Sequence, residues 1–119
     1  MSTTIRTRAF LGDGQHDLAL TDPMILELER LTGLGIGTIY GLLADMRFGF
    51  PHVAETIRLA LIGGGATPAD AQALCLAYVA NRPLAETFPV ALDALDARWN
   101  GVPVTPAPAP EAPAEEAAA

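Results

Sequence analysis

The chain has 119 residues, of which 50% are apolar and 18% charged, enough for one domain with its own hydrophobic core. A net charge of −7 opposes binding to nucleic acid and to anionic membrane surfaces. No apolar run reaches the roughly 18 residues of a membrane span, and the N-terminus lacks a signal-peptide pattern. With a single cysteine, Cys75, which cannot form an intrachain disulfide, these features predict a cytoplasmic protein.

The first predicted element is a β-hairpin over residues 3–20. Gly12-Asp13-Gly14 supplies an Asp-Gly turn between two strand-like segments. Side chains alternate across a strand, so the first segment should have two faces, one with Ile5, Thr7 and Ala9, and the other with Arg6, Arg8 and Phe10. An isolated hairpin is marginal in water, so we expect this one to pack on the rest of the chain.

Five short helices are predicted to follow the hairpin. Cap residues, prolines, glycines and apolar periodicity place them near residues 23–32, 38–47, 52–61, 68–80 and 84–99. Pro89 favours a later start for the last helix as an alternative. The apolar stripes expected on the second and last helices comprise Ile39, Leu42, Leu43 and Met46, and Leu84, Phe88, Leu92, Leu95 and Trp99, respectively.

The composition changes at Pro103, where a segment rich in proline, alanine and acidic residues begins. Such a segment buries too little apolar surface to offset the entropy of ordering. We therefore predict a domain over residues 1–102 and a disordered acidic Pro/Ala tail over 103–119. The predicted fold class is α+β, mostly α, with the N-terminal hairpin packed on a bundle of about five short helices.

The sequence offers no convincing catalytic, cofactor or metal site. His16 and His52 are isolated, and Cys75 falls on the inner stripe of its helix, where a cysteine usually behaves as a small apolar residue. The glycine clusters at 33–37 and 62–65 lack the spacing of nucleotide-binding loops, and the chain has no lysine. We therefore expect no enzyme activity, no catalytic residues, no cofactor and no metal. By elimination, a binding or assembly role remains.

Four ordered segments carry a resemblance to a known family. They are FLGDGQHDLALT, LELERLTGLGIGTIY, IRLALIGGGATPADA and YVANRPLAETFPVALDAL, and the resemblance covers about residues 8–100. The chain resembles the tail assembly chaperone-like proteins of gene transfer agents and related phage-like prophages, a family also labelled phage tail tube protein. Ala60 stands where the family pattern has glycine.

The resemblance implies an assembly chaperone that binds the tape measure protein or tail tube protein transiently. The alternative it implies is a structural tail tube subunit that stays in the particle. A homo-oligomer is compatible with either role. A small enzyme or regulatory domain from outside the family is the third hypothesis, which a bound cofactor or a polar pocket would support.

The residues themselves suggest where a partner would bind. The third helix with its glycine loop and the two phenylalanines before it expose more apolar surface than one stripe needs, which can mark an interaction face. The predicted contact residues are Phe48, Phe50, Leu59, Ile62 and Gly64. Packing in the core is the competing interpretation of the same residues.

Overall fold

The computed structural model describes residues 2–104 and has the predicted α+β architecture, mostly helical with an N-terminal hairpin. Residues 105–119, most of the predicted tail, lie outside the described part. In chain order, the elements are β1 (Thr3–Thr4), β2 (Arg6–Leu11), β3 (Gly14–Ala19), α1 (Asp22–Thr32), α2 (Ile36–Ala44), α3 (Phe50–Gly63), α4 (Pro68–Tyr78), α5 (Leu84–Asn100) and β4 (Val102–Pro103).

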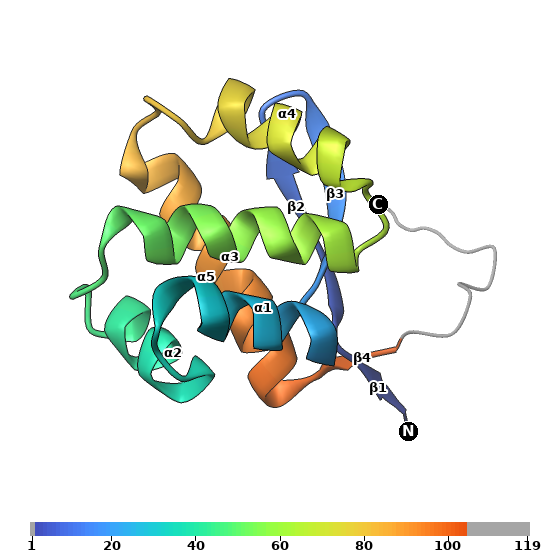
Figure 1. Cartoon of the computed structure of the whole chain (residues 1–119). Coiled ribbons are helices and arrows are strands. Elements are labelled where there is room, and N and C mark those ends of the chain that lie inside the picture. Colours follow the sequence, from blue (N-terminus) through green and yellow to red (C-terminus); the bar gives the residue numbers. More distant parts are fainter. Residues whose placement is uncertain (1, 105–119) are drawn as a thin grey trace, which may run out of the picture.

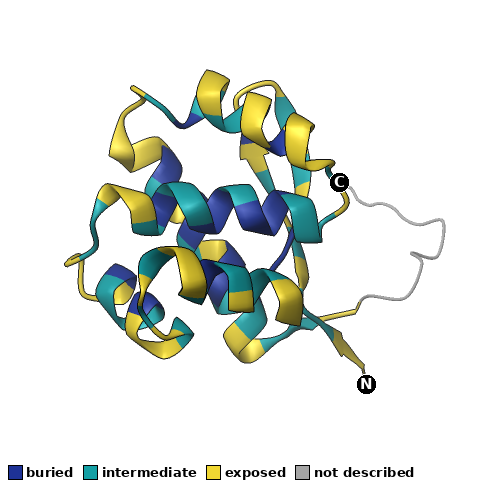
Figure 2. Cartoon of the chain, in the orientation of Figure 1, coloured by how far each residue is buried: buried dark blue, intermediate teal, exposed yellow. Residues whose placement is uncertain are grey.

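Helix α3 is the central element of the core. In Figure 1 it crosses the middle of the molecule, with α4 on one side, α1 and α2 on the other, and α5 and the hairpin behind it. Its buried positions recur around much of its surface, and Figure 2 shows their concentration in the centre of the molecule. Val53, Ile57 and Leu59 are at most 1% exposed. Burial on several sides explains why the sequence of α3 is apolar beyond a single stripe.

The predicted hairpin is formed by β2 and β3. Arg8 lies opposite Asp17, and the turn falls at Gly12, whose φ of 66° is readily adopted by glycine. As expected from the alternation, Arg8 and Phe10 are exposed while Leu11 is buried. The strand is interrupted at Ile5, because residues 3–4 turn away to pair with residues 102–103 in a separate two-stranded sheet. Pro103, predicted to begin the tail, therefore belongs to β4.

The predicted apolar stripes are correct in the middle of the helices and wrong near their ends. Ile39, Leu43 and Leu95 are buried, but Met46 is 67% exposed. Helix α2 ends at Ala44, and Met46 adopts a left-handed φ of 59°, which takes its side chain off the helical stripe. Leu84 and Trp99 are also exposed, because they lie at the ends of the 17-residue helix α5, beyond the neighbours that cover its centre.

Helix α5 begins before its internal proline. It starts at Leu84, with Pro89 inside the helix and exposed, so the later start that Pro89 favoured is not observed. Its buried face is formed mainly by small residues, Ala91, Ala94 and Ala97, together with Val90 and Leu95. These small side chains allow α3 and β2 to approach α5 closely.

Candidate partner-binding surfaces

The five predicted contact residues do not form one surface. Phe48 is half-buried and stacks on Phe88 of α5, with ring centroids 5.1 Å apart. Leu59 is 1% exposed and belongs to the core, so it is not accessible to a partner in this structure. Phe50 alone is well exposed, at 49%. The central position of α3 is the reason, since most of its apolar surface is covered by other elements of the same chain.

Ile62 and Gly64 lie where α3 meets the hairpin. Ile62 packs on the core cluster, and a Cβ on Gly64 would lie 2.1 Å from the carbonyl oxygen of Asp17 in β3. On Gly63, a Cβ would lie 1.9 Å from the carbonyl oxygen of Ala19. These glycines thus let the end of α3 approach the backbone of β3 more closely than any other residue would allow.

A shallow apolar groove runs between α3 and α4. It is lined by Phe50, Ala54, Glu55, Arg58, Gln72, Cys75, Leu76, Val79 and Ala80. Phe50 and Leu76 are exposed in it, and Glu55 and Arg58 form an ion pair of 2.6 Å along the same stretch of α3. Burial raises the pKa of the Cys75 thiol to about 11. A cysteine in this state is protonated at neutral pH and contributes packing rather than nucleophilic chemistry.

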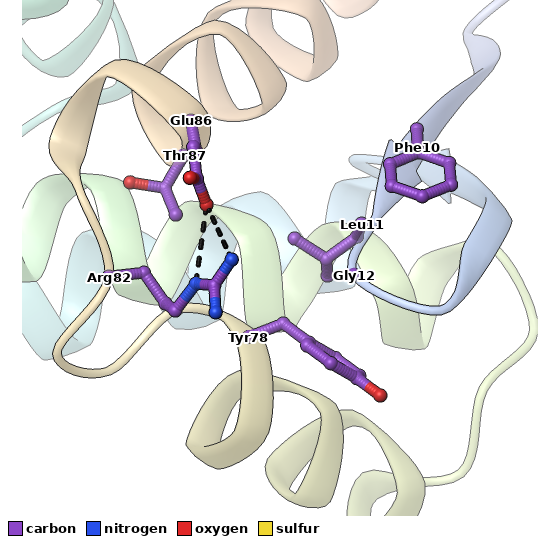
Figure 3. Close-up of a pocket in the computed structure, with 7 residues that line it drawn as sticks. All are labelled: Phe10, Leu11, Gly12, Tyr78, Arg82, Glu86 and Thr87. Atoms are coloured by element: carbon purple, nitrogen blue, oxygen red, sulfur yellow. Dashed lines mark hydrogen bonds and ion pairs between the residues drawn. The ribbon is translucent and has the colours of Figure 1, made fainter.

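A second hollow lies where the hairpin turn meets α4 and α5, as Figure 3 shows. Its volume is about 360 Å³, and Phe10, Leu11, Gly12, Tyr78, Arg82, Glu86 and Thr87 line it. Arg82 donates two hydrogen bonds, of 3.2 and 3.0 Å, to one carboxylate oxygen of Glu86. The hydroxyl of Thr87 is buried and has no hydrogen-bond partner within residues 2–104, and in Figure 3 it points away from Tyr78 and Leu11. The hollow combines aromatic walls with a neutralised ion pair.

The histidines make local hydrogen bonds. His16 Nε2 lies 2.7 Å from Asp13 Oδ1 across the hairpin turn. His52 Nδ1 accepts a hydrogen bond of 2.8 Å from the backbone N–H of Gly49 and so caps the start of α3. Across the described residues, no group of three or more histidine, cysteine, aspartate or glutamate side chains is placed to hold a metal ion.

The carboxylates of α5 differ in their surroundings. Asp96 accepts a short hydrogen bond from the hydroxyl of Tyr40 in α2, an interaction that raises the pKa of Tyr40. Asp93, one turn earlier, has a raised pKa because it is partly desolvated and lies near the charge of Asp96. The ring of Tyr40 also packs against that of Trp99, with centroids 4.9 Å apart. This cluster fastens α2 to the end of α5.

The comparison with family models identifies the group to which the sequence is related. The model described as phage tail tube protein, GTA-gp10, matches residues 4–101. The chain belongs to this family. The family match confirms the resemblance to gene transfer agent tail proteins, and it spans the hairpin and all five helices of the described part. No match was found among curated proteins or among solved structures.

The family description bears on the two roles expected from the sequence. It supports the structural tail tube alternative better than the assembly chaperone that we placed first. No helix within the described residues is long and apolar enough to cross a membrane.

Sequence reasoning missed one candidate binding feature of this phage tail tube family member, the outer edge of β2. The alternation placed Arg6, Arg8 and Phe10 together on one face of the strand, which the structure shows to be the exposed one. Only the tertiary structure shows that the two edges of the hairpin are covered differently, because that depends on where α3 ends.

Proposed function

We propose that this protein is a structural subunit of the tail tube of a phage-like particle of the gene transfer agent type. The observation that carries the proposal is the family match over residues 4–101, which includes nearly the whole described fold rather than one motif. The surface is compatible with assembly, since large apolar side chains such as Leu26, Leu76 and Trp99 are more than half exposed. Neighbouring subunits would cover such side chains.

An assembly chaperone is the second candidate, and the sheet topology favours it. The two sheets formed by residues 2–104 have two strands each, and α3 covers one edge of the hairpin. A tube wall made by continuing one sheet from subunit to subunit needs two open edges on each subunit. A chaperone that binds a tail tube or tape measure protein through one edge or groove needs only one such surface.

Particle composition separates the two roles. Particles would be purified from producing cells, and this chain would be quantified against the other tail proteins by mass spectrometry. A tube subunit should be present in fixed stoichiometry in finished particles. Absence from the particles, together with co-purification from the soluble fraction with a tail tube or tape measure protein, would overturn the structural proposal and establish the chaperone.

A further inference from the structure

The two edges of the hairpin differ in how they are covered. The end of α3 lies against the edge of β3, where the Cβ positions of Gly64 and Gly63 fall 2.1 and 1.9 Å from the carbonyl oxygens of Asp17 and Ala19. Arg6 reaches the same helix end and donates a hydrogen bond of 2.8 Å to the carbonyl of Gly64. The end of α3 therefore closes the edge of β3 to another strand.

The outer edge of β2 pairs with no other strand within residues 2–104. In an antiparallel pair, residues opposite each other point their backbone groups either both inward or both outward. Leu11 and Gly14 close the two-residue turn as an inward-facing pair, so the backbone groups of Phe10 and Arg8, one and three residues away along the strand, point outward. Apart from the ladder with β3, the backbone N–H and C=O groups of Arg8 and Phe10 make no hydrogen bond within residues 2–104. Phe10 is 62% exposed, and the side chain of Arg8 is 63% exposed.

The charges at this edge indicate what kind of strand it would accept. Arg6 and Arg8 share the single carboxylate of Asp17, at 3.9 and 3.1 Å, so this face carries one unbalanced positive charge in a protein of net charge −7. Opposite charges facing each other across a strand pair stabilise it. We infer that the β2 edge binds an extended acidic segment of another protein as an added strand, with main-chain hydrogen bonds to Arg8 and Phe10.

A second copy of this chain fits the edge poorly. Antiparallel pairing of β2 with β2 about a twofold axis at Arg8 would place the two Arg8 side chains opposite each other. Pairing about Phe10 would bring Arg8 against Gly12, which belongs to the turn and not to the strand, so only a short stretch could pair. Pairing of β2 with the β3 edge of another copy is blocked by the glycines of α3. The inference deepens the proposed function. It rests on that proposal only in taking the acidic segment to come from another tail protein.

A peptide-binding experiment tests this inference on the full chain without particles. The probes are labelled synthetic peptides of about six residues, the usual strand length, in which valine alternates with either glutamate or lysine. The test variant combines Arg8→Asp with Asp17→Arg. It keeps an ion pair between the two strands but moves the arginine from β2 to β3, whose edge is closed. Its matched control, Glu27→Arg with Arg30→Glu, makes the same exchange in the exposed ion pair of α1.

Fluorescence anisotropy should show binding of the glutamate peptide to the unchanged protein and to the α1 variant. Binding to the hairpin variant should be weaker by about fivefold, the effect of exchanging one favourable cross-strand charge pair for a repulsive one. Equal binding of the lysine peptide, or equal binding by both variants, would overturn the inference.

Amide chemical shifts of the unchanged protein give a readout that does not depend on whether the hairpin variant folds. The glutamate peptide should shift the Arg8 and Phe10 signals most. Shifts centred on the α3–α4 groove instead would contradict the β2 edge. Because no particle is involved, failure of peptide binding would leave the tail tube proposal standing. Absence of the protein from finished particles would likewise leave the peptide-binding inference standing.

Discussion

Gly63 and Gly64 act through the space that their missing side chains leave for the backbone of β3. Both lie at the end of the central helix, with the carbonyl oxygens of Ala19 and Asp17 against them. The same close approach that fixes the hairpin on α3 also closes one of its edges. The packing of the hairpin on α3 and the closure of its β3 edge therefore depend on the same two residues, Gly63 and Gly64.

Alanine at position 64 should destabilise the protein. Its Cβ would overlap the Asp17 carbonyl at 2.1 Å, and relieving such an overlap costs about 1–3 kcal/mol. Gly41→Ala is the matched control, because no atom lies within 4 Å of its Cβ position and alanine favours a helix interior by about 0.5–1 kcal/mol. Urea unfolding should thus move the midpoint down for one variant and up for the other. A neutral Gly64→Ala would contradict the tight contact.

Cys75 should react slowly with alkylating reagents. Its pKa rises from 9.0 to about 11 on folding because the thiol is buried, so little thiolate exists near pH 8. Between those two pH values the folded thiol keeps a proton that the unfolded chain releases, so this group makes the protein less stable as the pH rises. Iodoacetamide labelling at pH 8 should be faster in urea than in buffer. Equal rates would show that the thiol is not protected.

At the level of elements, Arg98 joins the end of α5 to the connection between β3 and α1. It donates hydrogen bonds of 2.8 Å to the carbonyl of Leu20 and 2.7 Å to the carboxylate of Asp22. These residues are more than 70 positions apart in sequence. The hairpin is thus held from two sides, by the end of α3 and by the end of α5.

Replacing Arg98 by methionine should lower the stability by about 1–2 kcal/mol, since it removes a charged hydrogen bond to a buried strand end while keeping much of the side-chain volume. Arg82→Met is the control. Its ion pair with Glu86 is exposed and joins two residues four positions apart at the start of α5, so its loss should cost less than about 0.5 kcal/mol. Thermal unfolding of both variants measures the difference, and equal shifts would mean that Arg98 does not tether the two elements.

At the scale of the whole molecule, the charges on β2 decide how copies of the chain behave toward one another. Arg8 lies on the one hairpin edge that α3 leaves open, whereas the side chain of Arg6 reaches the end of α3. A charged side chain on an edge strand opposes pairing between identical edges. The open edge can then select an acidic partner without the chain adding to itself. A charged β2 edge is compatible with either role proposed for the protein, tail tube subunit or assembly chaperone.

Replacing Arg8 by threonine should therefore promote self-association. Threonine favours strands and removes the repulsion, so the dimerisation constant should strengthen by about fivefold or more, as measured by sedimentation equilibrium. Arg47→Thr, in the connection between α2 and α3, serves as the control for the change in net charge. An unchanged constant for the Arg8 variant would show that this arginine does not control pairing of the edge.

Local pattern determined the element types in this protein. Caps such as Thr67, whose hydroxyl accepts a hydrogen bond from the Asp70 N–H, and the Asp-Gly turn act between residues close in sequence, so the hairpin and five helices could be predicted. The ordered segments also identified the family. Periodicity failed at Met46, Leu84 and Trp99, because exposure at a helix end depends on where neighbouring elements stop.

Only the tertiary structure decided which surfaces are available to a partner. Leu59 and Phe50 are both apolar residues of α3, yet one is enclosed and the other is exposed beside α4. The two edges of the hairpin are likewise equivalent in the sequence pattern. They become different because the glycines of α3 reach β3 across more than 40 residues of chain, a contact that no local pattern specifies.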